Sequence, residues 1–327
     1  MPRLIGVAKD QKMLAIPNLR SSHASLIPTA GGVAIMIGIV FSILIWCPKT
    51  GETSLLSILT AFSSIFFLGL VDDIRGTKPS TKLLIQILIA FSLVVVGFRI
   101  EQLNGLFGIQ ELPFWASCLG TILFIVFIIN AYNLIDGING LMGSLVIQVA
   151  FLLGLWFFIV EDQLFAIIAF SIAGSVLAFL WFNFTPAKIF MGDSGSLLLG
   201  LTIALLTIRF LETPLELYNS YWTSSRMPLI ALSLSFIPVF DALRVALIRI
   251  NNGIHPFRAD KRHIHHLFLS NGFSHTQTTL ILVTINLSTL GMIVLLPAFN
   301  VYWALLLLVL YFGCLTHYLS LRRGLGQ

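Results

Sequence analysis

Charged side chains are scarce in this sequence, since only 10% of its 327 residues are Asp, Glu, Lys or Arg. A soluble globular domain carries about 25% charged residues, so most of this chain's surface is not built to face water. Cysteine is also rare, and Cys47, Cys118 and Cys314 lie within or at the ends of apolar stretches without paired spacing. We interpret them as packing residues, which excludes a disulfide framework and a cysteine-based metal site.

Linkers and leader segments are missing as well. No Pro- or Ser-rich linker, low-complexity tract or internal repeat divides the chain, so we expect a single domain over residues 1–327. The first thirty residues contain no apolar core of a secretory signal, which predicts that there is no cleavable signal peptide.

Long apolar runs are what the sequence has in abundance. Hydrophobic residues make up 57% of the chain, the mean hydropathy is +0.96, and stretches near the ~20 residues that cross a bilayer recur throughout. This pattern predicts an all-α, polytopic bundle of about ten transmembrane helices. The expected spans are 31–47, 54–71, 81–98, 114–132, 141–160, 164–184, 195–211, 228–250, 277–298 and 300–319.

The basic residues predict the orientation. With both termini in the cytoplasm, all but four of the 19 lysines and arginines fall on the cytoplasmic side, in line with the positive-inside rule. The four exceptions are Lys49, Arg99, Arg209 and Arg226. The net charge of +5 therefore reflects membrane topology, and no nucleic-acid partner is expected. Residues 1–30 become a cytoplasmic N-terminal loop and residues 251–276 a cytoplasmic histidine-rich loop.

The same topology separates the acidic residues. Those on the outer side are mostly glutamates in loops, and we interpret them as solvated surface charge. Those on the cytoplasmic side are all aspartates, namely Asp10, Asp72, Asp73, Asp136, Asp193, Asp241 and Asp260. Most of these abut long apolar runs, where an ionised group is costly and usually functional. Crowded carboxylates repel one another, and a divalent cation such as Mg²⁺ or Mn²⁺ would relieve that repulsion.

A structural explanation competes with this one, because each aspartate could cap a helix or pair with an arginine. Asp241 is the best candidate for such a pair, since Arg244 lies three residues later on the same helical face.

Three motifs place aspartates at span ends. Gly69-Leu-Val-Asp-Asp-Ile-Arg-Gly76 ends one span with the pair Asp72 and Asp73. Asn130, Asn133 and Asp136 recur at i, i+3 and i+6, so successive members are neighbours on a helix and can bind a metal, a ribose or a base. Phe190-Met-Gly-Asp-Ser-Gly-Ser196 precedes another span, where glycines and a helix N-terminus favour an anion, with Asp193 holding the cation that bridges its oxygens.

Two further motifs are rich in basic residues. Asp260-Lys-Arg-His-Ile-His-His266 combines basic residues with imidazoles, which suits phosphate contact and acid–base chemistry. A zinc site is the alternative, although the adjacent Lys261 and Arg262 would repel a cation. Pro17-Asn-Leu-Arg-Ser-Ser-His23 precedes the first span and adds Arg20 and His23 to the cytoplasmic side.

In this order, the five motifs resemble the polyprenyl-phosphate N-acetylhexosamine-1-phosphate transferases, glycosyltransferase family 4. The resemblance covers essentially the whole chain, and the His-Ile-His-His loop is similar to the branch that acts on N-acetylglucosamine phosphates. The Pro-Asn-x-Arg-Ser-Ser-His stretch is similar to enzymes that initiate O-antigen or related surface polysaccharides.

The resemblance implies a reaction in the bacterial cytoplasmic membrane, on its cytoplasmic face. A phosphate oxygen of undecaprenyl phosphate attacks the β-phosphorus of a UDP-amino-sugar, and UMP leaves. Direct attack and a two-step route through an aspartyl intermediate both stay open, as does a homodimeric assembly.

The resemblance also implies roles for particular residues. The implied catalytic residues are Asp72, Asp73, Asp193, His263, His265 and His266. The implied substrate-binding residues are Asn130, Asn133, Asp136, Asn139, Phe190, Arg262, Arg20 and His23. The implied ligands of the metal, Mg²⁺ with Mn²⁺ as the alternative, are Asp193, Asp73 and Asn133.

This sequence departs from the family pattern in three places. The family usually has a further span before the Pro-Asn stretch, and the residues ahead of Pro17 are too few to cross a bilayer. Asn139 stands where many relatives have a second aspartate. Arg75 and Gly76 follow the aspartate pair where relatives have a third acid.

Two other function classes stay in view. A transporter or flippase of an anionic lipid or nucleotide sugar would place its ionisable groups near the bilayer midplane, whereas these aspartates collect at one face. A family member that binds lipid phosphate without turnover is the other.

Overall fold

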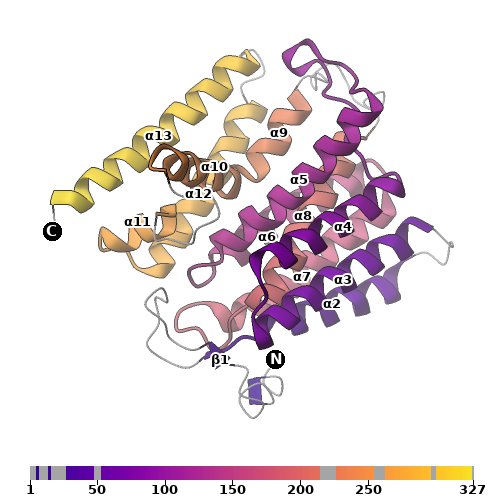
Figure 1. The fold of residues 1–327 in the computed structure, drawn as a ribbon, viewed down its shortest axis with the longest axis horizontal. Helices are drawn as coiled ribbons and strands as arrows, with labels where there is room; N and C mark the ends of the chain where they lie inside the picture. Colours follow the sequence, from indigo (N-terminus) through magenta and orange to yellow (C-terminus); the bar gives the residue numbers. More distant parts are fainter. Residues whose placement is uncertain are drawn as a thin grey trace.

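The computed structural model describes residues 5–6, 14–15, 27–47, 53–213, 226–253, 262–295 and 300–325. Long helices running side by side dominate this part of the chain (Figure 1). The strands are β1 (Leu14–Ala15) and β2 (Ile27–Pro28), an antiparallel pair in which Leu14 lies opposite Pro28. The helices are α2 (Gly31–Trp46), α3 (Thr53–Arg75), α4 (Pro79–Val95), η1 (Leu106–Gly108), α5 (Phe114–Ile135), α6 (Leu141–Ile159), α7 (Gln163–Asn183), α8 (Gly192–Leu211), α9 (Met227–Leu234), α10 (Phe236–Asn251), α11 (Ile264–Ser270), α12 (His275–Leu295) and α13 (Val301–Leu325).

The lengths of these helices suit a bilayer. Seven helices of the described chain are long and apolar enough to cross a membrane: α3, α5, α6, α7, α8, α12 and α13. The bent pair α9–α10 would make an eighth span, and α2 and α4 are shorter apolar helices of 16 and 17 residues. The prediction of an all-α polytopic membrane bundle is confirmed. The number of spans and the location of the termini stay predictions.

Helix α8 forms the centre of the bundle. Every residue from Ser194 to Leu211 is buried except Arg209, and the helix packs against α2, α3, α5, α6, α7 and α9. A helix that is apolar all round is stable only inside such a ring of helices. Large apolar side chains on the outer helices, such as Leu44, Trp181 and Trp303, are exposed and suit contact with lipid.

Glycines allow three of these helices to approach closely at one end. A side chain at Gly32 of α2 would overlap the backbone of Gly195 in α8. A Cβ at Gly69 of α3 would lie 2.5 Å from the Cα of Ser194. Small residues at such crossings are typical of membrane helix pairs, because they let backbones meet. The N-terminus of α8 is therefore held between α2 and α3.

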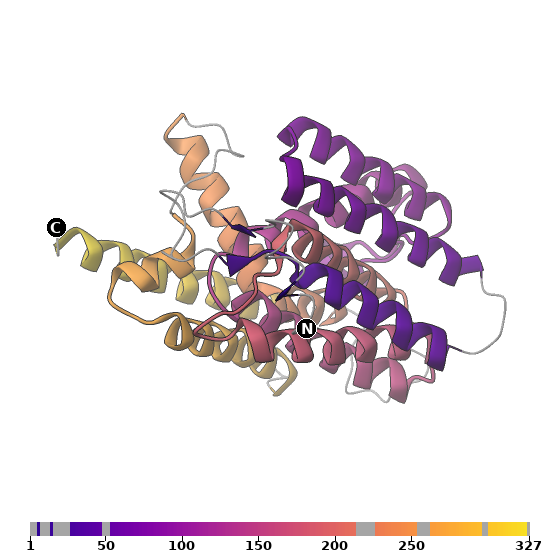
Figure 2. The same ribbon diagram turned by 90° about the horizontal axis from the view of Figure 1, so that it is seen from below.

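The span predicted over 228–250 is not one continuous helix, because α9 and α10 meet at an angle of 80°. Pro238 has no N–H to donate to the Leu234 carbonyl, so the regular helical bond cannot form. Asn286 of α12 compensates: its Nδ2 donates to the Leu234 carbonyl at 2.9 Å and its Oδ1 accepts from Ile237 N at 3.1 Å. Figure 2 shows α10 projecting away from the bundle as a result.

Candidate active site

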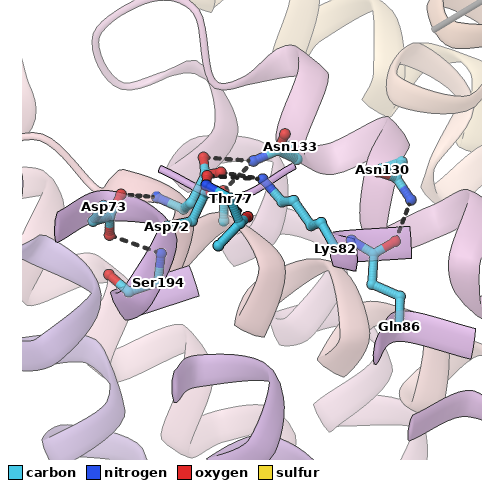
Figure 3. Close-up of polar contacts among 10 residues, drawn as sticks. Asp72, Asp73, Thr77, Lys82, Gln86, Asn130, Asn133 and Ser194 are labelled. Atoms are coloured by element: carbon cyan, nitrogen blue, oxygen red, sulfur yellow. Dashed lines mark hydrogen bonds and ion pairs between the residues drawn. The ribbon is translucent and has the colours of Figure 1, made fainter. Parts of the chain in front are cut away.

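Two aspartates and a lysine meet where α3 ends and α8 begins (Figure 3). The Lys82 ammonium of α4 lies 3.3 Å from Asp72 Oδ2 and also pairs with Asp193 Oδ2. The side chains of Lys82, Asp72 and Asp193 are 17%, 19% and 29% exposed, so the group is mostly enclosed but open on one side. One cation is thus shared by two carboxylates, which leaves an excess of negative charge at this point.

The turn after α3 fixes the position of Asp72. Thr77 donates to Asp72 Oδ1 from its hydroxyl and also from its backbone N at 2.7 Å. Pro79 then starts α4 at a position where a missing N–H has no consequence. Lys82 follows within the first turns of this helix and therefore faces back towards the end of α3.

Asn133 of α5 connects a third helix to the group. Its Nδ2 donates to Asp193 Oδ1 at 3.0 Å and to Ser196 Oγ at 2.7 Å. Each oxygen of Asp193 therefore has a partner from a different helix, Lys82 from α4 and Asn133 from α5. The predicted proximity of Asn133 and Asp193 is present in the structure.

Asp73 has a different position from its neighbour. Its Oδ1 accepts from Asp193 N at 2.7 Å and its Oδ2 accepts from Ser194 N at 3.0 Å, so it caps the first turn of α8. Gly192 makes this possible, because its φ of +75° is strained for other residues and a Cβ there would meet the Asp73 carboxylate. The structure gives Asp73 the task of holding Asp193 in place, and its role as a metal ligand stays a prediction.

The loop before α8 is bound to the segment before α2. Phe190 N donates to the Pro28 carbonyl at 2.8 Å, and Gly31 N donates to the Phe190 carbonyl at 2.9 Å. Phe190 itself is partly buried in this connection. The chain from Pro28 to Gly31 thus lies beside the Asp193 motif. The predicted N-terminal motif ahead of it, with Arg20 and His23, falls outside the described residues.

Asp136 and Asn139 lie in the turn between α5 and α6. Burial raises the pKa of the Asp136 carboxyl well above its usual range, and the charges of Asp193 and Asp73 raise it further. Asn139 is buried against α12 instead, where its N donates to His275 Nδ1 at 3.3 Å and its carbonyl accepts from Thr279 Oγ1 at 3.0 Å. Asp136 therefore belongs electrostatically to the aspartate group, and Asn139 anchors the turn.

The histidine loop reaches the same turn. His265 is 1% exposed, and its Nε2 packs against Gly137, where a Cβ would overlap the ring. Burial, followed by the neighbouring His266, lowers the pKa of the His265 imidazole to about 3, so this ring is neutral at physiological pH. The ring of His265 stacks on that of His263, with centroids 5.9 Å apart and planes at 7°. Two motifs more than 100 residues apart are thereby in contact.

Asn130 lies one helical turn deeper than Asn133. Its Nδ2 donates to Gln86 Oε1 of α4 at 2.7 Å, and Gln86 is fully buried. Figure 3 shows this pair apart from the aspartates. Asn130 thus links α4 to α5 below the group, on the faces that carry Lys82 and Asn133.

Lys82 and Gln86 were not among the predicted site residues. In the sequence, a single lysine at a span end indicates membrane topology, because that is what the positive-inside rule predicts. Its signal was the spacing of Lys82 and Gln86 at i and i+4, which puts both polar groups on one face of an otherwise apolar helix.

Known proteins resemble this chain over most of its length. A probable undecaprenyl-phosphate N-acetylglucosaminyl 1-phosphate transferase of Bacillus subtilis is 33% identical over 270 residues, covering 82% of this chain and 73% of the relative. A decaprenyl-phosphate N-acetylglucosaminephosphotransferase of Mycobacterium leprae is 33% identical over 303 residues, covering 85% and 76%. The undecaprenyl-phosphate alpha-N-acetylglucosaminyl 1-phosphate transferase of Escherichia coli is 30% identical over 313 residues, covering 93% and 82%.

The model of glycosyl transferase family 4 matches residues 55–211. The chain belongs to this family. The matched region runs from α3 to α8 and contains Asp72, Asp73, Asp136 and Asp193, whereas the histidine loop lies beyond it.

The group formed by Asp72, Lys82 and Asp193 is chemically suited to bind a divalent cation. No group of three or more His, Cys, Asp or Glu side chains within the described residues converges as a complete metal cage. Mg²⁺, however, is commonly bound by one or two carboxylates together with substrate phosphates and water. Asp72 and Asp193 already face one cation, the Lys82 ammonium, so their oxygens form the kind of donor set that Mg²⁺ prefers.

Proposed function

We propose that this protein transfers an N-acetylhexosamine 1-phosphate, or a related amino-sugar phosphate, from a UDP-sugar to undecaprenyl phosphate. The observation that carries the proposal is the Asp72–Lys82–Asp193 group at the N-terminal end of α8. Membership of a family whose relatives are named as polyprenyl-phosphate N-acetylglucosamine-1-phosphate transferases supports the substrate class.

The proposed reaction exchanges one phosphorus–oxygen bond for another. A phosphate oxygen of the lipid forms a bond to the β-phosphorus of the UDP-sugar. The bond from that phosphorus to the oxygen bridging to the α-phosphate breaks, and UMP leaves with this oxygen. The product is a polyprenyl diphosphate sugar that stays in the membrane. Charge on the phosphate oxygens is the main obstacle, so electrostatic stabilisation should supply most of the catalysis.

The residues of the site have distinct parts in this reaction. Asp72 positions or deprotonates the lipid phosphate, and Lys82 moves from the two carboxylates to the transferring phosphates. Asp73 holds Asp193 at the start of α8. Asn133 and Asp136 face the nucleotide, and Phe190 stacks on its base. The histidine loop, with Arg262, contacts the diphosphate or the sugar.

Asp193, together with Asp72, would hold Mg²⁺ or Mn²⁺, which when bound supplies positive charge to the phosphate oxygens. The N-terminus of α8 adds a favourable partial charge at the same place. The ligands predicted from the sequence are Asp193, Asp73 and Asn133, and the hydrogen bonds of Asp73 and Asn133 orient Asp193.

We further propose that the protein works in the bacterial cytoplasmic membrane with this site facing the cytoplasm, where UDP-sugars are available. The predicted positive-inside topology supports this side. The product would then serve as the lipid-linked start of a surface polysaccharide such as an O-antigen.

The test is release of UMP by the purified protein, given undecaprenyl phosphate, Mg²⁺ and a panel of UDP-amino-sugars. We expect release with at least one sugar, and we expect Asp193→Asn to lower the rate by at least about 10²-fold, the loss typical of a removed electrostatic group. Asp162→Asn is the matched control, since Asp162 also pairs with a basic residue but lies at the far end of α8.

Full activity of a folded Asp193→Asn protein would contradict the proposed role of this carboxylate. Failure of the wild-type protein with every UDP-amino-sugar, in the presence of lipid acceptor, would contradict the proposed function. Transport of the labelled sugar or lipid across vesicles in that case would favour a transporter, and binding of the lipid without turnover would favour a non-catalytic family member.

A further inference from the structure

Asp241 on α10 is a buried carboxylate to which the proposed reaction gives no task. Its side chain is 2% exposed, and its Oδ1 pairs with Arg244 Nη2 at 2.8 Å, as the spacing of the two residues predicted. That pair accounts for only part of its contacts. The remaining contacts are made with a segment more than twenty residues later in the chain.

Asp241 binds the beginning of the histidine loop through both oxygens. Oδ2 lies 2.8 Å from His263 Nδ1, and Oδ1 accepts from Ile264 N at 2.9 Å. Arg244 adds a bond from Nη2 to the Arg262 carbonyl at 2.6 Å. Three consecutive residues are therefore fixed to α10, and α11 starts from this fixed point.

The contact with His263 determines which ring nitrogen is available. An ionised carboxylate can only accept hydrogen bonds, so His263 Nδ1 must carry the proton. Nε2 is then the nitrogen that can meet another group. A carboxylate that orients an imidazole in this way acts on the chemistry of the ring without touching the substrate.

His263 is connected to the candidate site by packing. Its ring stacks on that of His265, which in turn packs against Gly137, the residue after Asp136. His263 is the imidazole of the pair that has an acidic partner.

We propose that Asp241 is a positioning residue, which holds His263 with the proton on Nδ1 and thereby presents Nε2 as a hydrogen-bond acceptor to a hydroxyl group of the sugar donor. The role at the sugar donor rests on the proposed function, whereas the protonation pattern of the ring does not. Asp241 is then more than a structural partner of Arg244.

The sharpest variant is Asp241→Asn. An asparagine has the same size, and its oxygen can still accept from Ile264 N and Arg244. Its amide nitrogen would donate to His263 Nδ1, however, which moves the ring proton to Nε2. We expect the KM for the UDP-sugar to rise tenfold or more, and the KM for the lipid acceptor to change less than twofold.

A double-mutant cycle with His263→Gln separates this role from general stabilisation. If Asp241 acts through His263, then Asp241→Asn should have little additional effect in a His263→Gln protein, and the two changes should not add. Additive effects would overturn the proposal. Arg244→Gln is the matched control, because it removes the ion pair and leaves the Asp241–His263 contact in place. An effect of Arg244→Gln on the KM as large as that of Asp241→Asn would also overturn it.

A measurement without substrate tests the protonation pattern independently. Nitrogen NMR of histidine-labelled protein in lipid nanodiscs, with His263 assigned by its loss in His263→Gln, distinguishes the two neutral ring forms. We expect the proton on Nδ1 in the wild-type protein and on Nε2 in Asp241→Asn. A proton on Nε2 in the wild type would overturn the inference. Absence of UMP release with the expected ring form would contradict the proposed function and leave the positioning geometry supported.

Discussion

The two ends of α8 both carry acidic and basic side chains, yet they are organised differently. At the first turn, Asp193 shares Lys82 with Asp72, so two carboxylates compete for one cation. At the last turn, Arg209 pairs with Asp162, and nearby Arg99 pairs with Glu101. Glu212, the C-cap of α8, is a further acid at the far end, where it accepts from Glu101 N at 2.8 Å. One partner of each far-end pair is about half exposed, Arg209 at 47% and Glu101 at 48%, whereas the three near-end side chains are less than a third exposed.

At the far end, the charged side chains make contacts that stabilise the fold. Asp162 also caps α7, accepting from Phe165 N at 3.3 Å, and the Arg209 guanidinium lies 5.3 Å from the Phe165 ring centroid. Each group there has a local structural partner. At the near end, two carboxylates share one ammonium in a mostly enclosed position, which costs free energy unless a cation or substrate makes use of it. The difference between the ends favours the near end as the candidate active site.

The largest expected effect comes from removing the shared cation. Lys82→Met leaves the Asp72 and Asp193 carboxylates facing each other without a positive charge. We expect UMP release to fall by about 10²–10³-fold, the range for a lost electrostatic group. We also expect the melting temperature in detergent to fall and to recover in part with added Mg²⁺, because a divalent cation can replace the ammonium between the carboxylates.

Arg209→Met is the matched change at the far end, and it should make melting no more dependent on Mg²⁺ than in the wild type. Equal Mg²⁺ dependence in the two variants would contradict the view that only the near end is built for a cation.

A smaller effect is expected from changing the close packing that supports the near end. Gly69→Ala places a methyl group against the backbone of Asp193 and Ser194, and overpacking of this kind typically costs about 1–3 kcal/mol. Gly120→Ala is the control in α5, since a Cβ there meets nothing within 4 Å. We expect it to be neutral or to stabilise by up to about 1 kcal/mol, as Ala is the better helix former. Thermal unfolding of both variants measures the difference, and equal stability of the two would contradict the packing argument.

The smallest effect is expected from the far-end ion pair itself. The Arg209 side chain is 47% exposed, and exposed ion pairs contribute about 0–1 kcal/mol. Arg209→Met should therefore change stability by less than about 1 kcal/mol and leave the rate of UMP release within twofold of the wild type. A rate loss comparable to that of Lys82→Met would mean that the two ends are coupled, and the comparison would fail.

Much of this molecule follows from local patterns in the chain. The apolar runs predicted the helices closely, because crossing a bilayer requires about 20 apolar residues with internally bonded backbone. The expected span 54–71 corresponds to α3, and 114–132 to α5. Asp72, Asp136 and Asp193 stood out for the same reason, since ionised groups beside apolar runs are rare.

The break between α9 and α10 is a feature that local sequence patterns do not predict. Pro238 was a visible signal for it, but membrane helices often tolerate proline. The bend persists because Asn286, almost fifty residues later, donates to the Leu234 carbonyl that the proline leaves without its helical donor, and accepts from Ile237 N at the start of α10. Only the packing of α12 against α9 brings that amide into place.

By itself, the sequence determined the class of fold, the order of the motifs and the rim at which the acidic residues gather, because each depends on hydropathy and spacing within one segment. The tertiary structure alone decided which contacts, and therefore which role, each of those residues has. Asp72 and Asp73 are adjacent in the chain, yet one shares Lys82 with Asp193 and the other caps α8. Asp241 binds His263 as well as the nearby Arg244. The physical reason is that a carboxylate's role depends on which donors surround it, and those donors come from other helices.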